Sequence, residues 1–136
     1  MKLEDQVCSL ELSKKLKELG VSIEESCFYW RKSSILWSER WGLLIDPEMR
    51  DCSDISAFTV AELGEMLPGE FEHGVFTYHL NTWWHDSLRE DSNEWQVGYC
   101  LYGSEITFDG KVFTGTEADC RAKMFVYLIE QGIVKP

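Results

Sequence analysis

Residues 116–132 read TEADCRAKMFVYLIEQG and predict a capped amphipathic helix. Thr116 can accept a hydrogen bond from a first-turn amide, and Gly132 supplies the left-handed conformation that often ends a helix. Apolar residues recur between them at helical spacing, so the helix has one face to bury. Small residues near its start would let that face lie close to a sheet. The apolar face comprises Ala118, Ala122, Phe125 and Ile129, widened by Met124 and Leu128.

Two further segments predict helices on the same grounds. Near the N-terminus, Ser9 can cap a helix that ends at Gly20. Farther along, Thr59 and Glu62 have the spacing of a capping box, and Pro68 ends the short helix that follows. The residues expected to face inward are Cys8, Leu12, Leu16 and Leu19 in the first helix, and Val60, Leu63 and Leu67 in the second.

Much of the remaining chain is rich in aromatic and β-branched residues, which favours strands. Residues 27–45 predict a hairpin with the polar residues 31–34 as its turn, and residues 46–57 predict a loop. We therefore expect an α+β fold: a single antiparallel sheet of about four to five strands, packed by an N-terminal and a C-terminal helix, plus one short middle helix. The later strands are predicted at about 74–84, 95–102 and 105–113.

Length and composition limit the class of protein. The 136 residues fit a single domain, 1–136, and the hydrophobic content of 44% is too high for a disordered chain. We see no leader peptide and no apolar run approaching the roughly 18 residues that span a bilayer. The five cysteines are odd in number and include no Cys-x-x-Cys pair, which favours free thiols in a reducing compartment. We expect a cytoplasmic protein with no membrane partner.

Acidic charge is concentrated in the middle of the chain. Residues 46–95 contain two Lys or Arg against twelve Asp or Glu, and so carry almost all of the net charge of −11. Residues 1–45 are balanced, and residues 96–136 hold four basic against five acidic side chains. Such a field repels nucleic acid and attracts a basic protein surface. The alternative is that the acidity only keeps the protein in solution.

The sequence contains no recognised catalytic, metal-binding or phosphate-binding motif. His73, His79 and His85 are six residues apart, which matches no zinc pattern. Cys120 lies in the first turn of the last helix, where the helix dipole lowers a thiol pKa, but neighbouring carboxylates oppose this effect and favour an unreactive thiol. No glycine-rich loop joins a strand to a helix in the way that cradles phosphate. We therefore expect neither a metal nor a cofactor.

Six tryptophans are too many for a core of this size to enclose completely. Trp83 and Trp84 are adjacent on a predicted strand, so their side chains point to opposite faces. One of them is then partly exposed beside acidic residues, an arrangement that suits the Arg or Lys side chains of a protein partner. The alternative is core packing across both faces of the sheet. The candidate interface residues are Trp83, Trp84, Asp86, Glu90, Asp91 and Glu94.

Three stretches resemble a family of small proteins encoded by phages and prophages. They are SAFTVAELGEMLP at residues 56–68, the segment 116–132, and LSKKLKELGV at residues 12–21, which the aromatic run 28–30 follows. The family has no assigned functional residue to carry over, because the shared residues are those that capped amphipathic helices need. The resemblance implies a protein of the bacterial host cytoplasm. Residues 71–95 resemble the family least, and we expect a partner-specific surface there.

These observations lead to one leading hypothesis and two alternatives. The leading hypothesis is a phage- or prophage-type accessory protein that binds, without catalysis, a host protein with a basic surface, such as a defence component; a homodimer through exposed aromatics is also open. The first alternative is a small hydrolase that uses His79 or His85 with an acidic partner within hydrogen-bond reach. The second is a module that sequesters a nucleotide or other small ligand in a tryptophan-lined pocket. That pocket would include at least one of Arg31, Lys32, Arg40 and Arg121.

Overall fold

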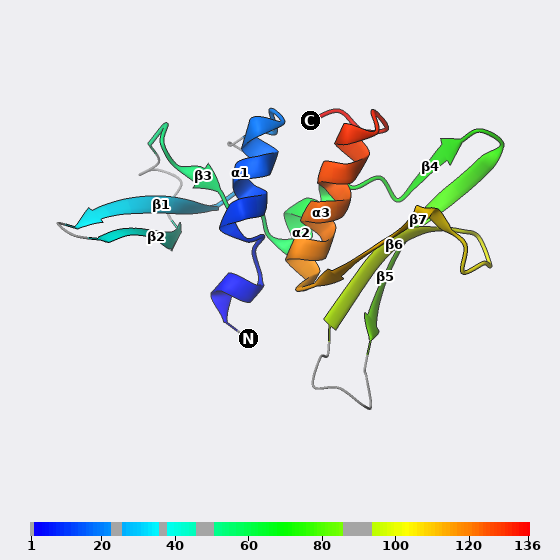
Figure 1. The fold of residues 1–136 in the computed structure, drawn as a ribbon, viewed down its shortest axis with the longest axis horizontal. Helices are drawn as coiled ribbons and strands as arrows, with labels where there is room; N and C mark the ends of the chain where they lie inside the picture. The colour runs from blue at the N-terminus through cyan, green and yellow to red at the C-terminus, as the bar shows by residue number, and fades with distance from the viewer. Residues whose placement is uncertain (1, 23–25, 36–37, 46–50, 86–93) are drawn as a thin grey trace.

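In the computed structural model, a layer of helices lies between two separate antiparallel sheets (Figure 1). The structure describes the whole chain except residues 1, 23–25, 36–37, 46–50 and 86–93. In chain order the elements are η1 (Leu3–Asp5), α1 (Leu10–Glu18), β1 (Phe28–Ile35), β2 (Ser38–Ile45), β3 (Ile55–Ser56), α2 (Val60–Met66), β4 (Glu70–His73), β5 (Phe76–His85), β6 (Glu94–Leu101), β7 (Thr107–Gly115) and α3 (Glu117–Glu130).

The α+β class is confirmed, but the expectation of a single sheet is wrong. One sheet has the strand order β2-β1-β3 and the other has the order β4-β5-β6-β7, and the two stand on opposite sides of the helices (Figure 1). The first hairpin completes its own small sheet locally, because Tyr29 and Trp30 of β1 pair with Ser56 and Ile55 of β3. The helices then have to cover two apolar surfaces rather than one.

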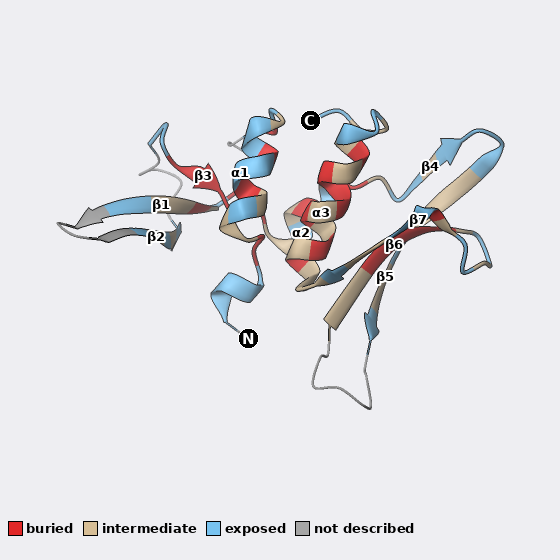
Figure 2. Ribbon diagram, in the orientation of Figure 1, coloured by how far each residue is buried: buried red, intermediate tan, exposed pale blue. Residues whose placement is uncertain are grey.

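The central helix α3 is suited to this double role because it is buried on several sides (Figure 2). Its predicted stripe is inward-facing, and Cys120 and Val126 are also buried. α3 contacts β6 and β7 on one side and α1 and α2 on the others. The core around α3 includes Leu16 of α1, Leu63 of α2, and Val97 and Tyr99 of β6.

Local capping chemistry accounts for the helix starts. At α2, the hydroxyl of Thr59 accepts a hydrogen bond from the Glu62 amide at 3.2 Å, and the Glu62 carboxylate accepts one from the Thr59 amide at 2.7 Å, which confirms the predicted capping box. At α3, Thr116 accepts from the Asp119 amide at 3.2 Å. Ser9 precedes α1 as predicted, but its side chain makes no cap; its amide instead donates to the Asp119 carboxylate at 2.7 Å and links α1 to α3.

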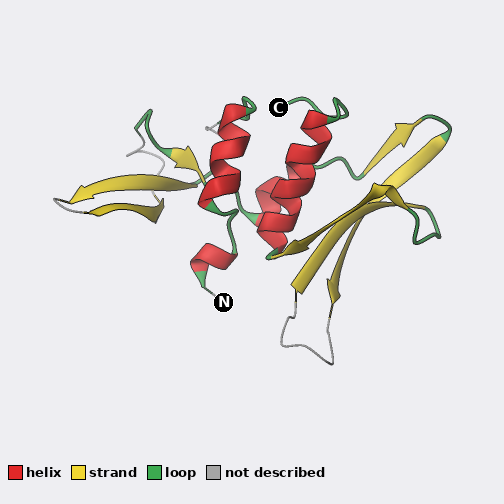
Figure 3. Ribbon diagram, in the orientation of Figure 1, coloured by secondary structure: helices red, strands yellow, loops and turns green. Residues whose placement is uncertain are grey.

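Two predictions about the first sheet are wrong. The polar residues 31–34 are not a turn but lie inside β1, which pairs with β2 along its whole length (Figure 3). Residues 46–57 were expected to be a loop, yet they contain β3. Polarity misled in the first case because Arg31 has a buried acidic partner, and length misled in the second because a strand of two residues has no periodic pattern.

In the second sheet, the three predicted strands correspond to β5, β6 and β7, and β4 was missed. β4 and β5 form a hairpin through Gly74, which has a positive φ of 63°. Asp109 and Gly110 were expected to supply a turn, but both take positive φ inside β7, where the register against β6 shifts. They form a bulge, which bends a strand without ending it.

Candidate functional site

One face of the four-stranded sheet has no helix against it. Val97 and Tyr99 are fully buried on the side of α3, so the alternate residues of β6 point away from the helices. The register between strands extends this assignment to β4, β5 and β7. We call this surface the open face; it comprises Glu70 and Glu72 of β4, His79, Asn81, Trp83 and His85 of β5, Glu94, Gln96, Gly98 and Cys100 of β6, and Val112 and Thr114 of β7.

Trp83 lies across the centre of the open face. Its indole Nε1 donates a hydrogen bond of 2.6 Å to the side-chain oxygen of Gln96, directly opposite on β6. The ring reaches over Gly98, since a Cβ at that position would stand 3.4 Å from Cη2 of Trp83. The same Cβ would also stand 3.3 Å from the Lys111 carbonyl oxygen. Glycine at position 98 therefore makes room for a flat indole ring.

Two adjoining pockets flank the ring. The first, of about 460 Å³, is lined by Trp83, Asn81 and Cys100 together with the loop before β7. The second, of about 510 Å³, is lined by His79 and by Tyr102, and both pockets share Asn81, Ser104 and Glu105. Tyr102 is 89% exposed, so the outer wall of the second pocket is an aromatic ring in solvent. The lining of both pockets is aromatic, polar and acidic.

His79 has the acidic partner that the hydrolase hypothesis requires. Its Nδ1 lies 3.3 Å from Oε2 of Glu70 on β4, and both side chains are substantially exposed. Ser104 lines the same pocket, but its hydroxyl accepts a hydrogen bond from the Ile106 amide at 3.1 Å. Within the described ranges, no hydrogen bond joins Ser104 to His79. The pair consequently lacks the nucleophile–base contact that activates a serine.

The charge of the four-stranded sheet is almost entirely negative. Among its described strand residues, Lys111 is the one Lys or Arg side chain. Its ammonium group lies 5.8 Å from the ring of Tyr127 on the α3 side of the sheet. Glu70, Glu72 and Glu94 lie on the open face, with Glu105 at the pockets. A cation approaching this face meets carboxylates and no competing positive side chain from the sheet.

The structure separates the residues that the sequence had grouped as an interface. Trp83 and Trp84 do point to opposite faces; Trp84 lies on the helix side, 5.4 Å from the ring of Trp95, and is 48% exposed. Glu94 begins β6 directly opposite His85. The other three predicted residues lie outside the described residues; they are Asp86, Glu90 and Asp91.

Sequence reasoning missed the contribution of β4 and of the β6–β7 loop. Glu70 and Glu72 were regarded as ordinary solvated carboxylates, yet they border His79 and Thr77 on the open face. Glu105 was expected inside a strand and instead lines both pockets. The alternation of Glu70, Glu72 and His73 with Phe71 was the available signal, but it extends over only four residues.

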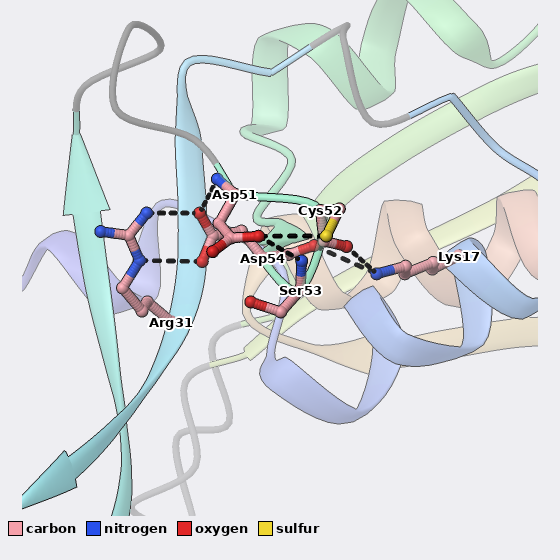
Figure 4. Close-up of polar contacts among 6 residues, drawn as sticks. All are labelled: Lys17, Arg31, Asp51, Cys52, Ser53 and Asp54. Carbon is pink, nitrogen blue, oxygen red and sulfur yellow. Dashed lines mark hydrogen bonds and ion pairs between the residues drawn. The ribbon is translucent and has the colours of Figure 1, made fainter.

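A second polar cluster fastens the three-stranded sheet to the rest of the molecule (Figure 4). Arg31 of β1 donates two hydrogen bonds to the carboxylate of Asp54, from Nε at 2.9 Å and from a terminal nitrogen at 2.7 Å. Asp54 is only 3% exposed and also accepts from the Asp51 amide at 2.8 Å. Lys17 of α1 donates to the carbonyl oxygens of Cys52 and Asp54. We call this cluster the clasp, since it joins β1, the loop before β3 and α1.

Two of the cations proposed for a ligand pocket are already engaged elsewhere. Arg31 belongs to the clasp, and its bonds to Asp54 raise the pKa of the guanidinium above its ordinary value. Arg121 forms an ion pair of 2.8 Å with Glu117 within α3. Lys32 and Arg40 lie on the three-stranded sheet, across the helices from Trp83. The two pockets beside Trp83 therefore contain none of the four.

The thiols offer no activated nucleophile at the helix starts. All five cysteines are free, and Cys27 and Cys52 are the exposed ones. Burial raises the pKa of Cys120 to about 11, and its sulfur donates to the carbonyl oxygen of Trp95 at 3.3 Å. Desolvation thus outweighs the helix dipole at Cys120, and the thiol stays protonated at neutral pH.

Comparison of the chain with protein-family models, with curated proteins and with solved structures finds no match. Within the described ranges, no three His, Cys, Asp or Glu side chains gather in a way that could hold a metal ion. In the same part of the chain, no helix is both long enough and apolar enough to cross a membrane.

Proposed function

We propose that this protein is a non-enzymatic binding protein that captures a protein partner with a basic surface through its open face. The observation that carries the proposal is the separation of charge across the four-stranded sheet. Glu70, Glu72 and Glu94 lie on the open face, whereas Lys111 contacts Tyr127 on the other side. Complementary charge of this kind speeds association and selects basic partners over acidic ones.

Trp83 supports a partner that presents arginine. The guanidinium group is planar and stacks on aromatic rings, and an indole is the most favourable ring for this contact. Trp83 lies over Gly98 and is held by Gln96, so its ring is positioned before any partner arrives. Glu105 and Asn81 line the adjoining pockets and supply oxygen atoms that can accept the guanidinium hydrogen bonds.

The sequence resemblance extends the proposal to a biological setting. Because segments 56–68 and 116–132 resemble proteins of phages and prophages, the proposed partner is a protein of the bacterial host, such as a component of its defence. Neither segment contributes to the open face. The setting and the binding surface therefore rest on different parts of the chain and can fail independently.

The test compares two variants with the same change in net charge. The first combines Glu70→Gln, Glu72→Gln and Glu94→Gln on the open face, and the control combines Glu4→Gln, Glu11→Gln and Glu65→Gln at exposed helical positions. Each variant and the parent protein are used to capture proteins from bacterial lysate at low and at high salt, with identification by mass spectrometry.

We expect a basic protein that the parent and the control capture at low salt and that the open-face variant fails to retain. High salt should weaken the same complex, because exposed charges are screened over about 8 Å at physiological ionic strength. Equal capture by the open-face variant and the control would show that overall acidity, rather than the open face, attracts the partner. Capture of no protein by any of the three would also contradict the proposal.

A further inference from the structure

The edge of β5 is only partly covered. β4 pairs with Phe76–His79, and the amide of Leu80 donates to the carbonyl oxygen of Gly69 at 2.9 Å. β5 continues beyond this last bond as far as His85. Figure 1 accordingly shows β4 beside only the part of β5 that is nearer their shared turn. The remaining part, residues 81–85, pairs with β6 on its other side.

The chain before β4 leaves this edge at Gly69. The carbonyl oxygen of Pro68 accepts a hydrogen bond from the hydroxyl of Tyr99, whose side chain lies on the helix side of the sheet. The amide of Leu67 is bonded within α2, to Leu63. Residues 67 and 68 therefore pass beneath the sheet and do not extend the pairing along β5.

The uncovered edge presents backbone groups that can bind another strand. Alternate residues of a strand direct their amides and carbonyls to the same side, so Thr82 and Trp84 follow Leu80 and point away from β6. In the part of the chain that the structure describes, neither the Thr82 amide nor the Trp84 amide has a hydrogen-bond acceptor on that side.

The opposite edge of the same sheet is protected. At β7, the ammonium group of Lys123 donates to the carbonyl oxygen of Thr114 at 3.0 Å, and the bulge at Asp109 and Gly110 interrupts the edge. Lysines and bulges are the devices by which sheet edges avoid pairing with other chains. Residues 82–85 read TWWH and contain no charged side chain of fixed sign, no proline and no glycine.

We propose that residues 82–85 of β5 bind an extended segment of the partner as an additional strand that continues the line of β4. This inference rests on the function proposed above and specifies how the partner is held. Successive side chains of an added strand point to opposite faces. One set would lie beside Trp83 and His85 on the acidic open face, and the other beside Trp84, which is 48% exposed on the helix side. The partner segment therefore alternates basic and apolar residues.

Charge favours a basic partner over a second copy of this chain at the same edge. Pairing of two β5 strands would join two four-stranded sheets and place two acidic open faces beside each other. Each chain has a net charge of −11, and the carboxylates concerned include Glu94, opposite the end of β5. Like charges so placed oppose association.

The test uses a synthetic peptide of four Arg-Val repeats, with a peptide of four Glu-Val repeats as its control. In the free protein, amide hydrogen exchange should be fast at Thr82 and Trp84 and slow at Trp83, whose amide faces β6. Saturation with the Arg-Val peptide should slow exchange at Thr82 and Trp84 by about tenfold or more. This measurement uses the unmodified protein and needs no substitution to fold.

Variants at residue 82 provide a second measurement. Thr82→Pro removes the outward amide without touching the bonds to β6, whereas Thr82→Val keeps the amide and the branched shape. The dissociation constant for the Arg-Val peptide should rise about tenfold in Thr82→Pro and stay unchanged in Thr82→Val.

The outcomes separate the two proposals. Arg-Val binding that shifts the NMR signals of Trp83 and His79 but leaves Thr82 and Trp84 in fast exchange would overturn strand addition and retain the open face as the site. Equal binding of both peptides, or of neither, would overturn both proposals. Protection of Thr82 that grows with protein concentration, in the absence of peptide, would identify a second copy as the occupant and also overturn the inference.

Discussion

The two sheets are both rich in aromatic residues but use their charged side chains in opposite ways. In the three-stranded sheet, Arg31 is held by the buried Asp54, and Trp41 lies under the ammonium group of Lys14, 5.0 Å away. In the four-stranded sheet, carboxylates such as Glu72 face solvent on the open face. Composition is similar, yet the position of compensating charge differs. A sheet whose charges are satisfied internally serves the fold, and one whose charges face outward can serve a partner.

The largest expected effect tests the internal half of this comparison. Asp54→Ala should lower the free energy of unfolding by about 3 kcal/mol, because it removes the hydrogen bonds from Arg31 and from the Asp51 amide at a position that is 3% exposed. Urea unfolding, followed by tryptophan fluorescence, measures the loss. Glu70→Ala is the matched control in the other sheet, where the pair with His79 is exposed, and should cost about 0.5 kcal/mol or less. Similar losses in both variants would remove the distinction between the two sheets.

Alkali should weaken the junction between α1 and the three-stranded sheet. The carbonyl oxygen of Cys8 accepts from Nε1 of Trp30, and burial raises the pKa of the Cys8 thiol from 9.0 to about 11. The unfolded chain ionises more readily than the folded one. The stabilisation is therefore complete below about pH 9 and is lost as the pH rises toward about 11, to the extent of about 2–3 kcal/mol.

Urea titrations between about pH 8 and about pH 11 measure this slope. Cys8→Ala should flatten the slope, whatever its effect on stability at neutral pH, whereas Cys27→Ala at an exposed thiol should leave it unchanged. A slope that survives in Cys8→Ala would assign the alkaline sensitivity to another group.

The helices could be predicted from the sequence because their signals are local. Thr59 and Glu62 form their capping box within one turn, and Thr116 caps α3 in the same way. The two-sheet arrangement could not be predicted, because it depends on β3, whose residues Ile55 and Ser56 pair with β1 more than twenty positions earlier. A two-residue strand has no alternation from which to infer it.

The open face was predictable only in part, for a related reason. Alternation placed Trp83 and Trp84 on opposite faces, which needs no knowledge of neighbouring strands. The contacts of Trp83 with Gln96 and Gly98, by contrast, depend on the register between β5 and β6. Register follows from turns and bulges that propensity does not locate, and so the pocket residues were not grouped with the tryptophans.

The smallest expected effect on stability probes the open face itself. Gly98→Ala should cost about 1 kcal/mol, because its new Cβ meets the Trp83 ring at 3.4 Å and the Lys111 carbonyl oxygen at 3.3 Å. Gly42→Ala is the matched control in β2, where a Cβ would meet nothing within 4 Å, and should be neutral or raise stability by about 0.5 kcal/mol. Urea unfolding of both variants checks the difference.

Gly98→Ala also separates the face from the edge within the four-stranded sheet. Lifting the Trp83 ring should shift its indole N–H signal, since the bond to Gln96 is strained or lost, and should weaken binding of the Arg-Val peptide about threefold. The amides of Thr82 and Trp84 point away from β6 and should still become protected when the peptide is saturating. If the indole shifts while affinity stays constant, arginine does not stack on Trp83, and binding depends on the carboxylates and the strand edge alone.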